Sequence, residues 1–140
     1  LCLPSIQTLD LGYNINLQGS LPNSNCNSCS FLKFLDLSRT KFSGELPDSI
    51  GSLKSLKHLN LYHCNFTGSI PTSLENLTQI THLILYFNNF TGPVPTLLWN
   101  LTQMTYLDLG SNSFTGEILL PLLNFRCSWH THELTISNYW

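Results

Sequence analysis

The chain has 140 residues, which is enough for one domain, and nothing in its length suggests two. Apolar residues make up 42% of it, ample for a core, whereas charged residues make up only 10%, far below the roughly 25% of ordinary soluble domains. The formal net charge of −2 is too small to steer the chain toward nucleic acid or an anionic membrane, and we expect no nucleic-acid partner.

The first residues, Leu1-Cys2-Leu3-Pro4, contain neither an initiator Met nor a basic n-region, so no signal peptide is visible. We therefore expect the chain to be a piece of a longer protein. After this start, apolar residues, one Asn, one Gly and one Pro follow in a spacing that returns later in the chain: Ile6, Leu9, Leu11, Asn14, Leu17, Gly19, Leu21 and Pro22.

Five cysteines leave at least one unpaired, or paired outside the chain. Cys26 and Cys29 form a lone Cys-x-x-Cys between the first copy of the pattern and the second. A zinc site would require a second such pair or two histidines at a fitting spacing, and neither follows. A local disulfide and two free thiols both stay open for this pair, and the pairing of Cys2 and Cys127 is open as well.

The same pattern returns along most of the chain. Equal intervals separate Leu35, Leu59, Leu83 and Leu107, whereas the interval from Leu9 to Leu35 is longer because two extra residues lie within it. A fixed period of this length is typical of repeat architectures. Each copy contains Leu-x-Leu, an apolar alternation that predicts a short strand with both leucines inward. Stacked coils would pair these strands into one continuous parallel sheet, in which each coil buries its neighbour's apolar edge.

The rest of each copy predicts turns rather than helix. The position held by Asn14, Asn88 and Asn112 needs a small polar side chain that bonds the backbone of neighbouring coils, and Thr40 and Cys64 hold the same position. The following Gly-x-(Ile/Leu/Val)-Pro turns the chain without helix, because Pro lacks an N–H donor and Gly tolerates tight geometry. We therefore expect a convex side rich in loops and 3-10 turns, with little α-helix.

The spacing L-x-x-L-x-L-x-x-N-x-(F/L)-x-G-x-(I/L)-P, in segments such as FSGELPDSIGSLKSL and FTGSIPTSLENLTQI, resembles the plant-specific leucine-rich repeat. The resemblance covers roughly residues 3–118. It implies an α/β-type leucine-rich-repeat solenoid, a right-handed superhelix with a parallel β-sheet on the concave face. We expect repeats over residues 1–123 and a degenerate or truncated C-terminal tail over residues 124–140.

The resemblance also implies a function. Such repeats form the ectodomains of plant receptor-like proteins and receptor-like kinases, particularly disease-resistance receptors. They imply a ligand-recognition module on the extracellular side of the plasma membrane, without enzymatic activity or cofactor, in defence or developmental signalling. The implied partners are a peptide or protein ligand, with pathogens among its sources, and a co-receptor of the full-length protein. The alternative is a secreted inhibitor of a pathogen's cell-wall-degrading enzyme, because plant polygalacturonase inhibitors use similar repeats.

The outward positions of the predicted strands form the candidate ligand-binding face. In successive copies the residue just before Leu-x-Leu is aromatic or a histidine, and in two copies the residue just after it is a tyrosine. We expect these side chains to be exposed. Aromatic residues are common at binding hot spots, whereas the structural alternative is that they pack across strands to stabilise the sheet. We predict binding, because the rings point away from the leucine core. The candidate residues are Phe34, Asp36, His58, Asn60, Tyr62, His82, Ile84, Tyr86, Tyr106 and Asp108.

Catalysis and metal binding fit these residues poorly. Asp36 and Asp108 are expected three strands apart, about 14 Å at about 4.8 Å per strand, whereas a glycosidase needs carboxyls about 5 to 9.5 Å apart. His58 and His82 are expected as neighbours, with neither a nucleophile beside them nor a third metal ligand in reach. Cys64 is expected to be buried and inert.

Four Asn-x-Thr sequons begin at Asn65, Asn76, Asn89 and Asn100, and all qualify as glycosylation acceptors in a secreted chain. They are two sites duplicated with the repeat, since Asn89 follows Asn65 by one period and Asn100 follows Asn76 by the same period. Because no sequon occupies an outward strand position, glycans would flank the concave face without covering it.

After residue 116 the pattern breaks. Leu134-x-Ile136-x-Asn138 is a shortened echo of the strand motif, slightly more than one period after Leu107. A degenerate sixth coil, a poor cap and non-native sequence are all compatible with it. No membrane span is expected, because the longest near-apolar run, residues 118–123, has six residues, against about 20 for a spanning helix.

Overall fold

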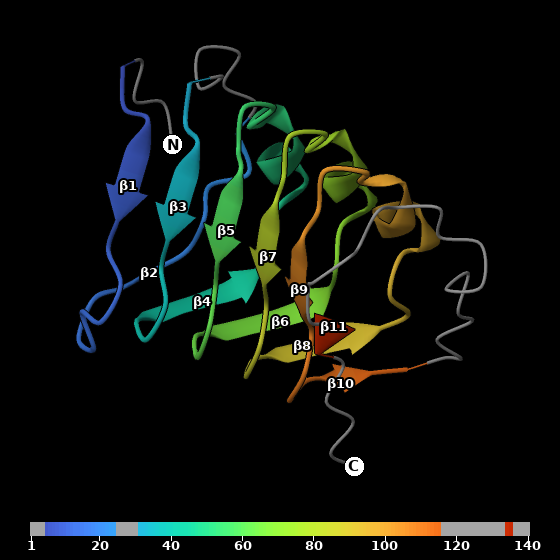
Figure 1. The fold of residues 1–140 in the computed structure, drawn as a ribbon. Coiled ribbons are helices and arrows are strands. Elements are labelled where there is room, and N and C mark those ends of the chain that lie inside the picture. Colours follow the sequence, from blue (N-terminus) through green and yellow to red (C-terminus); the bar gives the residue numbers. More distant parts are fainter. Residues whose placement is uncertain (1–4, 25–30, 116–133, 136–140) are drawn as a thin grey trace.

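The computed structural model describes residues 5–24, 31–115 and 134–135, and its parallel strands form two sheets (Figure 1). The first sheet is six-stranded, in the order β1-β3-β5-β7-β9-β11. Its neighbours come from successive copies of the repeat, so each coil adds one strand, as predicted for a solenoid. These strands are β1 (Thr8–Asp10), β3 (Phe34–Asp36), β5 (His58–Asn60), β7 (His82–Ile84), β9 (Tyr106–Asp108) and β11 (Leu134–Thr135).

The repeat spacing sets the register of this sheet. Leu9 pairs with Leu35 although the interval between them exceeds one period, so the two extra residues lie outside the paired strands. The second leucine of a pair lies just beyond the assigned strand, yet its N–H continues the ladder, as in the 2.9 Å bond from Leu37 N–H to the Asn60 carbonyl. The first leucines of the inner copies lie side by side and are 0% exposed: Leu35, Leu59, Leu83 and Leu107.

A second parallel sheet, five-stranded in the order β10-β8-β6-β4-β2, lies where the sequence predicts only loops and turns. The prediction of a single sheet is therefore incomplete. The segment after each polar position is extended and bonds to the preceding coil, as in the 2.7 Å bond from Lys41 N–H to the Leu17 carbonyl. Its aromatic residue points inward, and the buried rings of Phe66 and Phe90 stack 6.1 Å apart. The strands are β2 (Gln18–Gly19), β4 (Lys41–Glu45), β6 (Asn65–Ser69), β8 (Asn89–Gly92) and β10 (Ser113–Phe114).

The convex side carries three short 3-10 helices, as expected: η1 (Asp48–Ser52), η2 (Thr72–Asn76) and η3 (Thr96–Asn100). Each follows a proline in an extended conformation, such as Pro47 with φ −75° and ψ 153°. Pro suits this place because it fixes φ and has no N–H to leave unsatisfied. Each of these helices buries an apolar side chain, and no α-helix occurs in the described part of the chain.

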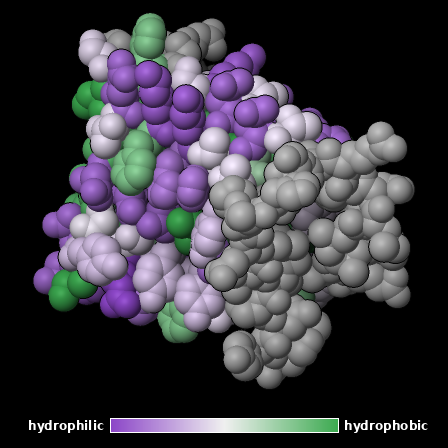
Figure 2. All heavy atoms as spheres, viewed as in Figure 1, coloured by the Kyte–Doolittle hydropathy of each residue, from purple (hydrophilic) through white to green (hydrophobic). Residues whose placement is uncertain are grey.

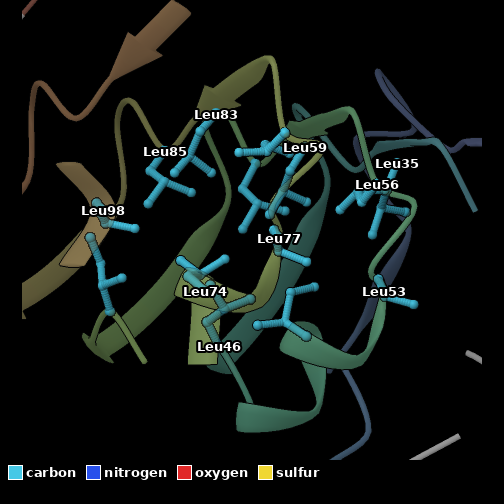
Figure 3. Close-up of a cluster of buried hydrophobic side chains, with 14 of the residues drawn as sticks. Leu35, Leu46, Leu53, Leu56, Leu59, Leu74, Leu77, Leu83, Leu85 and Leu98 are labelled. Atoms are coloured by element: carbon cyan, nitrogen blue, oxygen red, sulfur yellow. The ribbon is translucent and has the colours of Figure 1, made fainter. Parts of the chain in front are cut away.

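The core lies between the six-stranded sheet and the 3-10 helices, and leucines from both sides fill it (Figure 3). Leu59 and Leu83 enter from β5 and β7, whereas Leu74 and Leu98 enter from η2 and η3, and each is at most 1% exposed. Burying a Leu side chain contributes about 1.5–3 kcal/mol, so the stacked leucines hold neighbouring coils together.

The polar position of the inner copies connects neighbouring coils, as predicted. Asn88 Nδ2 donates to the Leu61 carbonyl at 2.7 Å, and its Oδ1 accepts from Phe66 N–H at 3.0 Å. Cys64 holds the same position one coil earlier, and its thiol donates to the Leu37 carbonyl at 3.0 Å. Because buried polar groups need partners, these bonds fix the turn of one coil against the next.

One short piece of the C-terminal region is also placed. β11 pairs with β9 so that Leu134 lies beside Leu107, the register that the shortened echo of the motif predicts. A degenerate sixth coil and a cap are both compatible with this pairing, because either would add a strand beside β9. Most of the tail lies outside the described residues, as do Cys2, Cys26, Cys29 and Cys127, so the boundaries at residues 123 and 124 stay predictions.

Candidate functional site

Rings from four neighbouring strands stack on the outward face of the six-stranded sheet. The centre of the Phe34 ring lies 4.4 Å from that of His58, with 11° between their planes. His58 lies 5.3 Å from His82, and His82 lies 5.9 Å from Tyr106 with 22° between their planes. We call these four residues the ring column. Because the rings lie largely face to face, their edges rather than their faces point away from the sheet.

The outward side chains are less exposed than the sequence predicts. His58, Asn60 and Tyr62 are half-buried, because a side chain between two neighbours loses surface to both of them. Burial lowers the pKa of the His58 imidazole, and the nearby His82 lowers that pKa further, whereas Asp36 opposes both effects. His58 therefore resists protonation more than a free histidine does.

Wherever the middle outward residue of a strand is Asp or Asn, its side chain caps the turn that follows the strand. A side-chain oxygen accepts from the N–H two residues on, as in the 2.7 Å bond from Ser38 N–H to Asp36 Oδ1, and Asn60 and Asp108 make the same bond. Ile84 has no polar atom and cannot do so. Asp108 is only 9% exposed, and burial raises the pKa of its carboxyl group, so it offers a ligand little surface. Asp36, Asn60 and Asp108 therefore stabilise the turns, a structural role that the sequence did not predict.

Beyond the strands, each described coil turns through a non-glycine residue with positive φ. This left-handed conformation favours Gly, so bulky side chains there are unusual. Backbone bonds between coils hold it, as in the 2.8 Å bond from Arg39 N–H to the Tyr62 carbonyl. Four of these residues carry a ring or a guanidinium group, and we call them the turn ridge: Tyr13, Arg39, His63 and Phe87.

The turn ridge continues into the tyrosine pair of the candidate face. Tyr62 stacks on Tyr86 with 5.5 Å between ring centres. The guanidinium carbon of Arg39 lies 5.2 Å from the centre of the Tyr62 ring and 5.5 Å from that of Tyr13. In Figure 2, pale side chains gather along the edge of the face where β1 to β7 end. Arg39 and Tyr13 directly follow the position of the tyrosine pair in their coils, but they are not among the ligand-binding residues predicted from the sequence.

The two candidate carboxylates lie on strands that are not neighbours. Asp36 and Asp108 lie in register on β3 and β9, with β5 and β7 between them, as the sequence predicts. Within residues 5–24 and 31–115, no three metal-ligating side chains come together. Cys64 is buried as expected, and burial raises the pKa of its thiol, which disfavours the reactive thiolate.

All four sequon asparagines are exposed. Asn65 and Asn89 begin β6 and β8, and Asn76 and Asn100 end η2 and η3. These elements are distinct from the six-stranded sheet that carries the ring column, so glycans on them would leave that face open.

The profile of a family described as a leucine-rich repeat region matches residues 2–125. Receptor-like protein 6 from Arabidopsis thaliana is 46% identical over 54 residues, which are 39% of this chain and 5% of that protein. The chain therefore spans a small part of this curated relative.

Two solved structures of plant receptors have the same fold. One is described as the plant peptide hormone receptor RGFR1 in complex with RGF2; it has a TM-score of 0.74 and 28% identity, over 80% of this chain and 18% of that chain. The other is the Arabidopsis receptor kinase HAESA in complex with the peptide hormone IDA and the co-receptor SERK1, with a TM-score of 0.70 and 32% identity, over 75% of this chain and 17% of that chain. Among the described residues, no helix has the length and apolar character of a membrane span.

Proposed function

The chain belongs to the leucine-rich repeat family, and on that premise we propose that its six-stranded sheet is a ligand-binding face of a plant receptor. The observation that carries the proposal is the ring column, four stacked rings that stand outward from fully buried leucines. Rings of this kind dominate the binding energy of many interfaces. The face acts by binding alone, without catalysis or a cofactor.

A peptide suits this face because of how the rings lie. In the ring column the ring faces are largely covered by one another, so a ligand would meet the ring edges, which carry the imidazole nitrogens of His58. An extended peptide supplies an N–H and a C=O at every residue, which such edges can bond. The titles of the RGFR1 and HAESA structures name a peptide hormone receptor and a bound peptide hormone, which supports the same ligand class here.

We place the longer protein on the extracellular side of the plasma membrane, where it takes part in defence or developmental signalling. The co-receptor named with HAESA supports a similar partner for the longer protein, and a pathogen is one source of the ligand. The alternative of a secreted inhibitor gains no support from these relatives, which are receptors.

The test of the binding face uses peptides selected from a random display library on the intact chain. Tyr86→Ala, at the tyrosine pair, should weaken the selected peptides at least tenfold, because a ring at a hot spot contributes about 2 kcal/mol or more. The matched control is Leu97→Ala, which truncates a side chain that is 37% exposed on η3 and should leave affinity unchanged. Failure to select any peptide, or an equal loss in both variants, would contradict the proposal.

The extracellular location has a separate test. Expression in a secretory host should add glycans at Asn65, Asn76, Asn89 and Asn100, which intact mass before and after deglycosylation would reveal. A secreted chain without glycans would count against this location.

A further inference from the structure

One coil differs from the others in how the turn after its strand is capped. Where the middle outward residue is Asp or Asn, the N–H two residues on donates to its side chain, as from Tyr62 N–H to Asn60 Oδ1 at 3.0 Å. In the coil of β7 the middle residue is Ile84, which has no oxygen to accept from the Tyr86 N–H. Within residues 5–24 and 31–115, this N–H has no acceptor.

The turn itself is the same in both coils. The next residue has a left-handed conformation in each, with φ 52° at His63 and 59° at Phe87. The Tyr62 carbonyl accepts from Arg39 N–H at 2.8 Å. The Tyr86 carbonyl makes the equivalent bond one coil later, accepting from His63 N–H at 3.0 Å. The Tyr86 N–H therefore lies on the outward side of its turn, as that of Tyr62 does, and the two differ only in the acceptor.

The surroundings of this N–H are apolar on one side. Ile84 is half-buried and lies in register between Asn60 of β5 and Asp108 of β9. Asn60 Nδ2 donates to Asp36 Oδ2 at 2.8 Å, whereas Ile84 has no polar atom with which to continue such bonding. An N–H beside an apolar side chain is partly shielded from water, so an acceptor supplied by a ligand gains a hydrogen bond there.

A neutral carbonyl oxygen suits this place better than a charged one. Asp108 lies beside Ile84, and the chain has a net charge of −2, so a carboxylate would approach a like charge. A peptide carbonyl carries no charge and accepts from an N–H as strand neighbours do. An extended peptide also presents a side chain close to each carbonyl, and an apolar one would contact Ile84.

We propose that the Tyr86 N–H and the Ile84 side chain form a subsite of the binding face, which holds a backbone carbonyl of an extended peptide beside an apolar side chain. This inference rests on the proposed function and specifies what the ligand presents to β7. The subsite exists because Ile84 stands where other coils have a capping Asp or Asn.

Amide hydrogen exchange, followed by NMR, tests the open donor in the free chain. Tyr62 and Tyr86 both follow a leucine, so their unprotected exchange rates are alike. The Tyr86 N–H should exchange about tenfold faster than the Tyr62 N–H, as expected for the loss of one hydrogen bond. Equal protection of the two N–H groups would overturn the proposal.

Two variants of one residue control this measurement. Ile84→Asn supplies a capping oxygen and should slow exchange of the Tyr86 N–H to the rate of Tyr62. Ile84→Val keeps an apolar, branched side chain and should leave exchange fast. If Ile84→Asn has no effect, the N–H does not face the outward side chain and the subsite is wrong.

Ester substitution tests the contact with the ligand. In a peptide selected on the native chain, each backbone amide is replaced in turn by an ester, which makes the preceding carbonyl a weaker acceptor. One position should lose about two- to tenfold in affinity, the range of one hydrogen bond, on the native chain and on Ile84→Ala. The same ester should cost nothing on Ile84→Asn, because the Asn oxygen already accepts from the Tyr86 N–H.

The ester scan also separates this proposal from the function on which it rests. If selected peptides lose affinity on Tyr86→Ala, yet no ester position responds to the residue at 84, the subsite is wrong and the binding face stands. If no peptide is selected on the native chain, the binding face is wrong and the subsite with it.

Discussion

The first coil, residues 6–22, has the same repeat pattern as the two inner coils, residues 56–71 and 80–95. The side chains of that pattern are more exposed in the first coil than in the inner ones. Leu9 and Leu11 are partly exposed, whereas Leu59 and Leu83 are 0% exposed. The first coil also exposes large apolar side chains, with Ile15 at 66%. Its strand β1 pairs with β3 on one side, while β5 and β7 have partners on both sides.

The difference shows that the repeat pattern determines the shape of a coil, whereas the neighbouring coils determine how far its apolar side chains are buried. The same contrast holds for polar groups. Asn88 bonds the backbone of the preceding coil and is 8% exposed. Asn14 is exposed, and within the described part of the chain it bonds its own coil, as in the 2.8 Å bond to the Leu11 carbonyl. Matched substitutions in the two regions should therefore have unequal effects on stability.

Truncation of a core leucine should show the largest difference. Leu83→Ala should lower the free energy of unfolding by about 2 to 5 kcal/mol, because it removes a fully buried side chain and leaves a cavity. Leu9→Ala at the same repeat position should cost less than half as much. Denaturant titration measures both, and equal losses would show that burial does not depend on the neighbouring coils.

A glycine at the contact between η1 and η2 gives the next largest effect. A Cβ added at Gly51 would overlap the Ser73 carbonyl oxygen of the next coil, and that backbone cannot move aside easily. Gly51→Ala should therefore cost about 1–3 kcal/mol, in the range of overpacked sites. The matched variant in the first coil is Gly19→Ala, whose Cβ would meet the Phe42 ring at 3.3 Å, a side chain able to shift. A stability loss at Gly19 as large as that at Gly51 would argue against tighter packing between the coils that follow the first.

Removal of the bridging amide should have a similar or smaller effect. Asn88→Ala leaves the Phe66 N–H without its partner inside the core, at a cost of about 1–3 kcal/mol. Asn14→Ala breaks bonds that water can replace, so its cost should be near zero. Thermal unfolding of the two variants compares them, and the account fails if Asn14→Ala is the more damaging.

A smaller effect concerns pH. The folded pKa of His58 lies below its ordinary value of 6.5, so the unfolded chain binds this proton more readily than the folded chain. Stability from this residue is fully present above pH 6.5 and is lost as the pH falls from there through the folded pKa. The native chain should therefore lose more stability between pH 7 and pH 5 than His58→Gln does.

His82→Gln is the control for the cause. It removes one of the groups that lower the pKa of His58 but leaves Asp36, which raises it, so the loss of stability on acidification should be shallower than in the native chain. A steeper loss in His82→Gln would mean that repulsion between the two rings plays no part.

The smallest effect should come from the outward face. Ile84→Ala truncates a half-buried side chain on the sheet surface and should cost far less than Leu83→Ala at the adjacent position. Chemical denaturation of this pair tests which face of β7 carries the core. Comparable costs would mean that the alternation had been assigned to the wrong face.

Much of the core could be predicted because the period alone determines it. Once copies recur at a fixed period, pairing in register places Leu59 beside Leu83, and the recurring strand motif explains why Leu134 lies beside Leu107. The outward positions of the candidate face follow from the same alternation, which is why the ring column was found.

Features that depend on contacts between different positions of the repeat could not be predicted from the sequence. The second sheet needs only short extended segments, and the pattern around Phe66 and Phe90 also fits a turn. The contacts of Arg39 join three coils and a left-handed turn, so neither the spacing nor the composition of the repeats indicates that two tyrosines hold this residue. The half-burial of His58 likewise follows from ring stacking, which requires knowledge of the side-chain orientations.

The central claim is that the outward face of the six-stranded sheet binds a peptide, and photo-crosslinking tests it most directly. A selected peptide carrying a photoreactive phenylalanine analogue is irradiated on the native chain, and mass spectrometry identifies the linked residues. We predict links within residues 58–63 and 82–87, which contain the central ring column and turn ridge. Links confined to the second sheet, β2 to β10, or to η1, η2 and η3 would contradict the claim.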